Sequence, residues 1–326
     1  MIKPLLSLLL CVSALSVSAQ PTVSVGRGGI TAEMLQQMRK SHPTTNADRA
    51  LRNALANNPD ATDRHFSNEV PSKGITDQKS SGRCWLFTGL NVMRSQMIRQ
   101  YGLGDFQFSQ SYSFFYDQLE KSNLFLQAVI DNAKKPMSDQ LNDWLFKNPL
   151  SDGGTFCGVI DVVSKYGLVP ADVMPESYNA NNTSRMANIL SLKLREYGLT
   201  LRKLSAAGKK STELEKQKLQ MLGTIYHILT ICLGEPVQHF TYTLRDASGK
   251  ALGETKTFTP QEFYKEYVGK DLKQTYVMVM NDPSRPYHKT YTIDMDRHSY
   301  DGLQWTYLNL PMEEIKPLAI ASIKDS

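Results

Sequence analysis

The sequence predicts an α+β fold, with helices over most of residues 84–233 and strands near the end. The first observation is a series of long stretches whose apolar residues recur at helical spacing. The second is a set of short β-type runs in the last quarter: Thr275–Met280, Lys289–Asp294 and Trp305–Asn309. With 326 residues, 41% of them hydrophobic and 21% charged, the chain can bury a large core.

The first nineteen residues have the layout of a secretory signal peptide. Lys3 gives a positive start, an apolar stretch follows, and Val17-Ser18-Ala19 ends in the small residues that a signal peptidase cuts. The apolar stretch is too short to span a membrane, and Cys11 lacks the surroundings of a lipoprotein cysteine. An ordinary N-terminal helix is the alternative. Residues 1–19 therefore predict export, to a bacterial periplasm or the extracellular space.

Residues 20–60 are predicted to form a polar leader. One helix is expected near Thr31–Lys40, with the Thr31 side chain as its N-terminal cap. Residues 61–180 are predicted to form a helical lobe, because helical periodicity and start signals such as Ser109 and Ser138 recur along it. Its expected helices are 84–101, 109–131, 137–147 and one that Asp152-Gly153-Gly154 opens and that runs through Tyr166.

An inserted αα-hairpin is predicted over residues 181–240. Two long helices, 186–206 and 212–233, carry charged residues on one face and are expected to stand off the rest of the fold. Residues 241–326 are predicted to begin a β-rich lobe with an antiparallel sheet. Ahead of its strands, Thr259-Pro260-Gln261-Glu262 has the pattern of a capping box with proline at the first helical position.

Gln78 and Cys84 form the strongest chemical signal in the chain. Gly82 permits a sharp turn just before an apolar helix, which places Cys84 in the first helical turn. Unpaired N–H groups and the positive end of the helix dipole stabilise a thiolate there, and the thiolate is the nucleophile. The Cys84 N–H and the Gln78 side-chain amide together would suit an oxyanion hole for acyl transfer. A buried structural thiol is the alternative interpretation.

This layout resembles the papain-like cysteine peptidases, and in particular their bleomycin hydrolase and aminopeptidase C branch. Ser81 and Arg83 depart from the usual papain signature, in which a second cysteine and a small residue stand at these positions. The resemblance covers most of residues 60–324. It is carried by Gln78–Phe87, Phe108–Asp117, Leu119–Asn123, Asp152–Gly154, Lys165–Pro170, Leu233–Pro236 and Thr259–Tyr264.

The resemblance implies a thiol aminopeptidase without cofactors that removes residues from peptide N-termini. Cys84 would attack the carbonyl carbon, and Gln78 would help to hold the oxyanion. Asp152, Gly153, Gly154 and Trp85 would line the substrate cleft. Asp152 is also read as a plain helix cap from the sequence alone. The branch further implies a homo-oligomeric ring, possibly a hexamer, in which the helical hairpin supports assembly.

A cysteine peptidase also needs a histidine base and an orienting asparagine. Six histidines occur: His42, His65, His227, His239, His288 and His298. His227 has the compact papain spacing but lies in a helical pattern, and neither His288 nor His298 precedes an asparagine in the family context. All six are interpreted as surface or packing residues. In the resembled branch, residues 319–326 would precede the strands with the base. We therefore expect a truncated chain, an incomplete sheet lobe and little turnover.

Composition excludes several other classes of site. The net charge of +5 is mild and the basic residues are dispersed, so no dedicated nucleic-acid site is expected. No metal-ligand spacing occurs, and Cys157 and Cys232 are read as core thiols rather than as part of a disulfide framework. Low cysteine use and the resembled branch favour the cytoplasm, which conflicts with the signal segment. Export remains our prediction, and a cytoplasmic location is the alternative.

Two other functions fit parts of the pattern. One is a non-catalytic peptide-binding or assembly protein derived from the peptidase. The other is a different thiol chemistry, such as transglutaminase-like acyl transfer, which also uses cysteine, histidine and an acid. The spacing from Gln78 to Cys84, together with Asp152-Gly153-Gly154, argues against the second.

Overall fold

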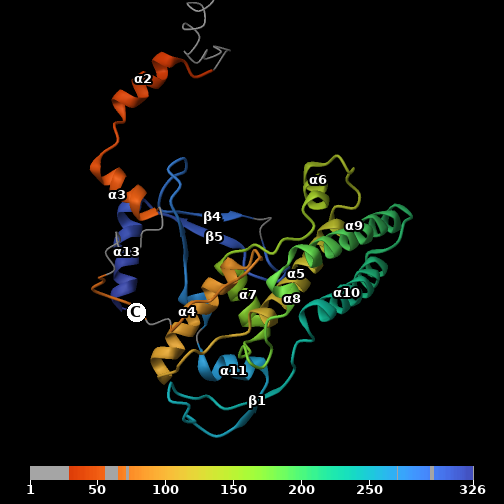
Figure 1. Cartoon of the computed structure of the whole chain (residues 1–326). Coiled ribbons are helices and arrows are strands. Elements are labelled where there is room, and N and C mark those ends of the chain that lie inside the picture. Colours follow the sequence, from red (N-terminus) through yellow and green to blue (C-terminus); the bar gives the residue numbers. More distant parts are fainter. Residues whose placement is uncertain (1–28, 56–64, 71–72, 270, 294–296, 326) are drawn as a thin grey trace, which may run out of the picture. The chain divides into compact units, whose positions relative to one another are not determined.

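The computed structural model describes residues 29–55, 65–70, 73–269, 271–293 and 297–325. The chain divides into two units, Met1–Ser67 and Asn68–Ser326 (Figure 1). The signal segment predicted over residues 1–19 lies outside the described residues. The second unit confirms the α+β class, because it combines long helices with two small sheets.

The first unit holds two described helices where the sequence predicts one. In α2 (Ala32–Ser41) the predicted cap is confirmed, because Thr31 Oγ1 accepts a hydrogen bond from the Met34 N–H at 3.1 Å. The second helix, α3 (Asn46–Leu55), corrects the prediction. It begins beside Thr45, whose N–H donates to an Asp48 carboxylate oxygen at 2.7 Å.

The helix that begins at Cys84 has the predicted bounds. α4 (Cys84–Tyr101) buries Leu86, Leu90 and Met93 and ends at Gly102, whose φ of 62° is the left-handed conformation that glycine adopts without strain. The next helix, α5 (Gln110–Asp131), starts after the predicted Ser109 cap. Ser109 Oγ accepts a hydrogen bond from the backbone N–H of Tyr112 at 3.1 Å.

Two helix starts differ from the prediction. α6 (Gln140–Lys147) is capped by Asp139 rather than Ser138, and an Asp139 carboxylate oxygen accepts from the Leu141 N–H at 3.1 Å. A carboxylate suits the positive helix end better than a hydroxyl, because it adds negative charge to the cap. α7 (Phe156–Tyr166) begins after Thr155, so the glycine pair lies in the preceding loop and not in the helix.

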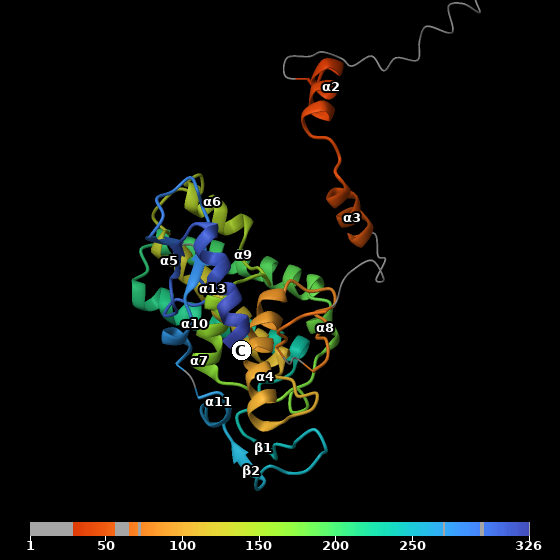
Figure 2. The ribbon, with the colours of Figure 1, turned by 90° about the vertical axis from the view of Figure 1, so that its left-hand side faces the viewer.

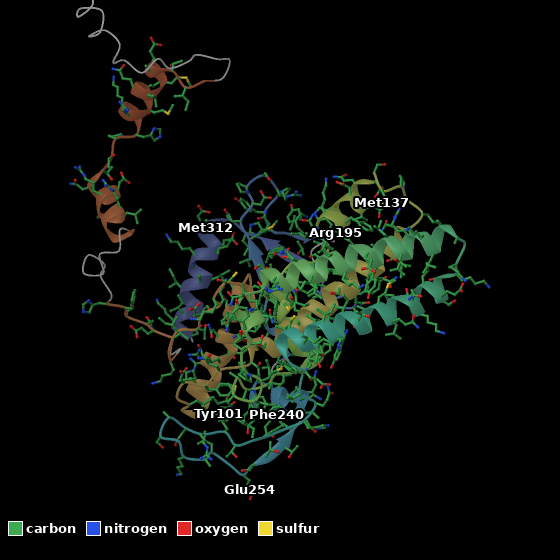
Figure 3. All side chains as sticks on the ribbon, turned by 45° about the vertical axis from the view of Figure 1, so that its right-hand side comes forward. Tyr101, Met137, Arg195, Phe240, Glu254 and Met312 are labelled. Carbon is green, nitrogen blue, oxygen red and sulfur yellow. The ribbon has the colours of Figure 1, made fainter. Side chains whose placement is uncertain are left out.

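The predicted helical hairpin is present but does not stand off the core. The short α8 (Tyr178–Asn181) leads into α9 (Ser184–Ala206), and α10 (Ser211–Leu233) follows. The apolar faces of α9 and α10 pack along α5, and residues such as Leu194 and Ile225 are fully buried there. Figure 3 shows both helices against α5, with Arg195 on α9. The hydrophobic effect explains the correction, because an isolated hairpin would leave those faces in water.

A two-stranded antiparallel sheet that the sequence analysis missed follows the hairpin. β1 (Phe240–Tyr242) pairs with β2 (Lys256–Phe258), and α11 (Pro260–Tyr267) covers them (Figure 2). The Phe263 ring of α11 lies 5.5 Å from that of Phe240 and 5.6 Å from that of Phe258. The capping box predicted at Thr259 is confirmed, since Thr259 and Glu262 exchange hydrogen bonds.

The last part of the chain forms a mixed sheet, not the antiparallel sheet that was predicted. After α12 (Leu272–Thr275), the strands β3 (Met278–Met280), β4 (Lys289–Ile293) and β5 (Trp305–Asn309) pair in the order β3-β5-β4, followed by α13 (Met312–Asp325). The chain reverses twice between β3 and β5. β5 therefore runs parallel to β3 and antiparallel to β4 when it inserts between them.

Candidate active site

The turn before α4 is closed by the side chain of Gln78. Its Nε2 donates to the carbonyl oxygen of Ser81 at 2.5 Å, and Ser81 Oγ donates back to the Gln78 carbonyl at 2.6 Å. The amide therefore has a structural partner in addition to the predicted oxyanion role. A primary amide carries two N–H donors, so one proton remains for a second acceptor.

Cys84 is exposed at the first residue of α4. Arg83, the residue at the N-cap position, makes no side-chain cap. The backbone N–H of Cys84 has no acceptor among the described residues, as expected for the first turn of a helix. The predicted thiol and the predicted oxyanion donor thus lie together at an uncapped, electropositive helix end.

Arg83 anchors this helix start, a role that sequence reasoning missed. The side chain is fully buried, and its guanidinium lies 2.7 Å from a carboxylate oxygen of Glu176. It also lies over the rings of Phe87 and Phe114, at 5.1 and 5.3 Å from their centroids. The carboxylate and the two aromatic faces offset part of the cost of burying this cation, while Nη1 and Nη2 make no hydrogen bond of good geometry among the described residues. Only its position beside the nucleophile could have drawn attention to it.

Asp152 joins the turn before Cys84 to the loop before α7. One of its carboxylate oxygens accepts from the Gly82 N–H and from Thr183 Oγ1, each at 2.7 Å. The reading of Asp152 as a helix cap is therefore wrong. The carboxylate lies so close to Gly82 that a Cβ on that residue would come within 2.7 Å of Asp152 Cγ. Glycine is required here by close approach, besides any need of the turn.

The buried side chain of Trp85 packs against the inner side of the same loop. It is 7% exposed, and its Nε1 donates to the Asp152 carbonyl at 2.9 Å. A Cβ on Gly154 would lie 2.8 Å from the Trp85 ring, so the loop rests directly on the indole. The structure thus brings all six predicted site residues into one neighbourhood, with Trp85 underneath it and not on its surface.

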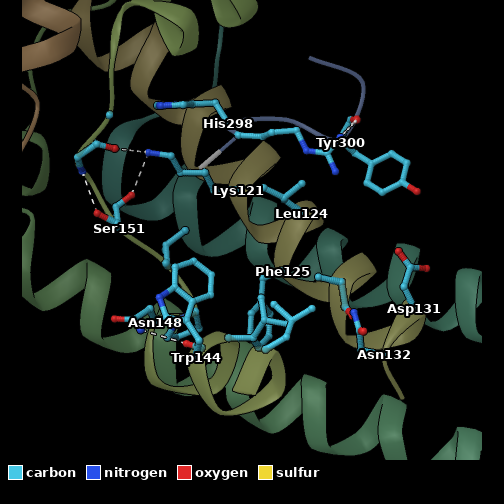
Figure 4. Close-up of a pocket in the computed structure, with 18 residues that line it drawn as sticks. Lys121, Leu124, Phe125, Asp131, Asn132, Trp144, Asn148, Ser151, His298 and Tyr300 are labelled. Carbon is cyan, nitrogen blue, oxygen red and sulfur yellow. Dashed lines mark hydrogen bonds between the residues drawn. The ribbon is translucent and has the colours of Figure 1, made fainter. Parts of the chain in front are cut away.

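A cavity of about 470 Å³ opens beside this loop (Figure 4). Its lining comes from α5, from α6, from the loop at residues 148–154 and from residues 297–300. Phe125 and Trp144 form apolar walls, and Gly153 and Gly154 form one edge. Cys84 does not line it.

His298 is the histidine that lies nearest to the predicted cleft residues. It is 2% exposed, its ring lies 4.7 Å from that of Trp85, and its Nδ1 lies 2.6 Å from an Asp117 carboxylate oxygen. Burial pushes the pKa of Asp117 upward, but Lys121 and His298 outweigh it and hold that pKa below its usual value. His298 is buried, and its interpretation as a packing residue stays a prediction.

No histidine in the described part of the chain forms a hydrogen bond with Cys84. His227 is exposed on α10, and His288 precedes β4, with its Nε2 3.4 Å from a Glu314 oxygen. The structure therefore brings the predicted nucleophile, oxyanion donor and cleft loop into one neighbourhood, and no described imidazole is hydrogen-bonded to the thiol.

The two other described cysteines differ from Cys84. Cys157 is buried as predicted, whereas Cys232 is half-buried, which corrects its reading as a core thiol. Burial raises the pKa of both thiols. Among the described residues, no group of three or more His, Cys, Asp and Glu side chains could hold a metal ion. Likewise, no helix in that part of the chain is long and apolar enough to cross a membrane.

Comparisons with known proteins agree with this geometry. The model of the Peptidase C1-like family matches residues 32–326. Aminopeptidase C of Lactobacillus delbrueckii subsp. lactis is 39% identical over 264 residues, which cover 80% of this chain and 58% of that protein. Bleomycin hydrolase of Homo sapiens is 39% identical over 269 residues, again 80% of this chain and 58% of the relative.

A solved structure agrees with them. The crystal structure of PepW from Lactobacillus rhamnosis HN001 is 35% identical to this chain and superposes with a TM-score of 0.77, covering 91% of this chain and 69% of that one. The chain thus spans 58% of the length of the curated relatives named above.

Proposed function

We propose that this chain, which belongs to the Peptidase C1-like family, carries the nucleophile of a cysteine-type aminopeptidase. The family places it among the papain-like cysteine peptidases, with relatives named aminopeptidase C and bleomycin hydrolase. The observation that carries the proposal is the exposed Cys84 thiol at the uncapped start of a well-buried helix. A buried structural thiol would not be presented in this way.

The proposed reaction removes the first residue of a peptide through a thioester. Cys84 Sγ attacks the carbonyl carbon of the first peptide bond, and the carbonyl electron pair moves onto oxygen. The Cys84 N–H and the second proton of the Gln78 amide stabilise that oxyanion. Collapse breaks the C–N bond, and the amine leaves with a proton from water, which balances the proton that the Cys84 thiol released to solvent when it ionised. Water then hydrolyses the thioester and frees Cys84.

Gly154 is proposed to bind the main chain of the peptide, beside Gly153, whose N–H donates to Ser151 Oγ at 3.1 Å and whose carbonyl accepts from Lys121. The N–H and carbonyl of Gly154 have no hydrogen-bond partner among the described residues, so both remain for an extended peptide. Asp152 ties this loop to the turn that precedes Cys84. A peptide held along the loop would therefore be fixed relative to the thiol, which is the positioning that acyl transfer needs.

We further propose that the 326-residue chain acylates once and turns over slowly. Deacylation needs a proton acceptor for the attacking water, whereas a thiolate can attack an activated ester without one, and no described histidine bonds to Cys84. Loss of a nucleophile's base typically costs several orders of magnitude in turnover.

An ester burst assay tests this proposal. The purified chain is mixed with an aminoacyl p-nitrophenyl ester, and released nitrophenol and acylated peptides are measured. We expect a burst of about one equivalent followed by slow release, with the acyl group on Cys84. Cys84→Ala should abolish the burst, whereas Cys232→Ala should preserve it. Fast, sustained release would mean that a described histidine acts as the base, and His288→Ala and His298→Ala would identify it.

Peptide binding without catalysis is the second candidate function. The observation in its favour is again that no described histidine bonds to Cys84. A chain that binds peptide in titration calorimetry but gives no ester burst at Cys84 would support it over the first.

Assembly into a homo-oligomeric ring is also proposed. It is supported by exposed apolar residues on the outer faces of the hairpin, since Leu192 of α9 is 66% exposed and Ile231 of α10 is 71% exposed. Light scattering on wild type and on the Leu192→Asp/Ile231→Asp variant would test it. A monomeric wild-type chain would contradict assembly of this chain.

Export is proposed from residues 1–19, whose charge and apolar pattern are those of a signal peptide. Mass spectrometry of the mature N-terminus in the producing cell should find cleavage after Ala19. An intact N-terminus in the cytoplasmic fraction would support the cytoplasmic alternative.

A further inference from the structure

Lys121 of α5 sits beneath the proposed peptide-binding loop. Its side chain is 11% exposed, and the ammonium lies 5.3 Å from the centroid of the Trp85 ring. The same ammonium donates to the carbonyl of Gly153 at 2.7 Å and to that of Ser151 at 3.1 Å. Figure 4 shows both bonds running from Lys121 to the loop.

The three protons of this ammonium match three acceptors. The third acceptor is Asp117, which is fully buried one helical turn before Lys121, with a carboxylate oxygen 2.9 Å from the ammonium nitrogen. Gln118 Nε2 adds a second donor to the Ser151 carbonyl at 3.0 Å. Because all three N–H groups of this ammonium are hydrogen-bonded and little water reaches them, the positions of the two carbonyls and the Asp117 carboxylate are restrained.

Side chains from two helices therefore fix three consecutive carbonyls. The Lys121 ammonium donates hydrogen bonds to the carbonyls of Ser151 and Gly153. The Trp85 indole donates to the carbonyl of Asp152, which lies between them. The next residue, Gly154, has no such tether among the described residues. The tethers thus turn three carbonyls of the loop toward the protein interior and leave the peptide group of Gly154 for a ligand.

We infer that Lys121 is a positioning residue, which sets the peptide-binding group at Gly154 by holding the carbonyls of Ser151 and Gly153 on the inner side of the loop. The inference rests on the proposed function, in which that group binds the main chain of a peptide near Cys84. Lys121 touches neither the thiol nor the peptide. Removal of the ammonium should slow the reaction of Cys84 with reagents that bind as peptides. It should leave the reaction of the thiol with small reagents unchanged.

Two alkylating reagents separate these effects. Iodoacetamide reports the reactivity of the Cys84 thiolate alone, whereas an N-acylated dipeptidyl chloromethyl ketone must also lie along the loop. The measured quantity is the ratio of the two second-order rate constants at Cys84, read by mass spectrometry. Because both reagents need the same thiolate, a change in its pKa cancels from the ratio.

Lys121→Met keeps an apolar side chain of similar length over Trp85 and removes the ammonium. We expect it to lower the ratio about tenfold or more, because a displaced binding group misplaces the reactive carbon. Lys165→Met is the matched control. Lys165 is also an ion-paired lysine, bonded to Glu120 of α5 at 2.6 Å, but it makes no bond to residues 151–154. The ratio of this control should stay within about twofold of wild type.

A second variant keeps the test valid if Lys121→Met does not fold. The single change leaves the buried Asp117 carboxylate without its cation, which is a costly state. Asp117→Asn combined with Lys121→Met removes both charges together, so the core stays neutral while the carbonyl tethers are lost. We expect this double variant to fold, as judged by circular dichroism, and to show the same low ratio.

The outcomes distinguish the two levels of the proposal. A wild-type ratio well above one with an unchanged ratio in the folded Lys121 variants would overturn the role of Lys121 and leave the proposed function intact. A wild-type ratio near that of free cysteine would contradict peptide binding beside Cys84, and both proposals would fall. Equal losses in the Lys121 and Lys165 variants would assign the effect to general loss of structure and would also overturn the inference.

Discussion

The helical region (residues 84–233) and the strand region (residues 276–325) bury their apolar side chains to different extents. In the helical region Leu86, Leu90 and Met93 of α4 are at most 1% exposed. In the strand region no residue of α13 is buried, and Leu318 and Ile323 are 57% and 50% exposed. Each fully buried side chain of this kind stabilises the fold by about 1.5–3 kcal/mol. The helical region therefore contributes more hydrophobic stabilisation than α13 does.

The strand region is joined to the helical region through polar contacts as well as apolar ones, such as that of the Tyr276 ring with Phe156. His298 Nδ1 is hydrogen-bonded to an Asp117 carboxylate oxygen, and the Lys165 ammonium lies 2.9 Å from an Asp301 carboxylate oxygen. The backbone N–H of Leu303 donates to Asp161 at 2.9 Å. Cys84 and the turn before it belong to the better-packed side of this division. The geometry of the nucleophile should therefore survive changes in the strand region that do not reach the helical core.

The largest effect is expected when a buried leucine of the helical region and an exposed leucine of the strand region are each changed to alanine. Leu86→Ala should lower the free energy of unfolding by about 2–5 kcal/mol, because it opens a cavity among fully buried neighbours. Leu318→Ala on α13 should change it by less than about 0.5 kcal/mol and should leave alkylation of Cys84 at its wild-type rate. Urea unfolding of both variants measures the difference. Similar losses of unfolding free energy in the two variants would contradict the difference in packing between the two regions.

The contact between the regions is expected to depend on pH through Asp161. Burial raises the pKa of this carboxyl to about 6, although the Leu303 N–H opposes the shift. The folded state holds the proton more tightly than the unfolded chain, whose ordinary value is 3.8. The stabilising contribution is therefore complete below about pH 4 and is lost as the pH rises through about 6. Its size is roughly 3 kcal/mol.

Asp161→Asn is the variant that isolates this effect. It keeps the shape of the side chain and removes the titration, so the fall in stability between pH 4 and pH 7 should become smaller than in wild type. Unfolding midpoints in urea across that range measure it. Parallel pH profiles for the two proteins would show that Asp161 does not titrate in this window.

The smallest of the three effects tests the turn that leads into the helical region. Gln78→Ala should slow acylation of Cys84 by about a hundredfold, the usual scale for one oxyanion donor. It also removes the bond to the Ser81 carbonyl, which should cost about 0.5–1.5 kcal/mol of stability. Ser81→Ala is the control, because it breaks two hydrogen bonds of the same turn and keeps the amide. Equal acylation by both variants would make Gln78 purely structural.

The sequence predicted well where the signal is local. The bounds of α4, the Ser109 cap and the capping box at Thr259 were all predicted, because periodicity and capping act over a few residues. The sequence predicted poorly the features that depend on contacts between residues far apart in the chain. The Asp152 carboxylate meets Gly82 seventy residues away, and neither position reveals the other. The parallel pairing of β3 with β5 and the buried ion pair of Arg83 with Glu176 depend on tertiary packing in the same way.

The central claim is that Cys84 is the nucleophile, and site-resolved alkylation tests it most directly. The native chain is treated with limiting iodoacetamide, and labelled peptides are quantified by mass spectrometry over time. Cys84 is exposed at a helix start, whereas burial raises the pKa of Cys157 and Cys232. We predict that Cys84 is labelled first, at least about tenfold faster than either of the others. Equal or earlier labelling of Cys157 or Cys232 in the folded protein would contradict the assignment.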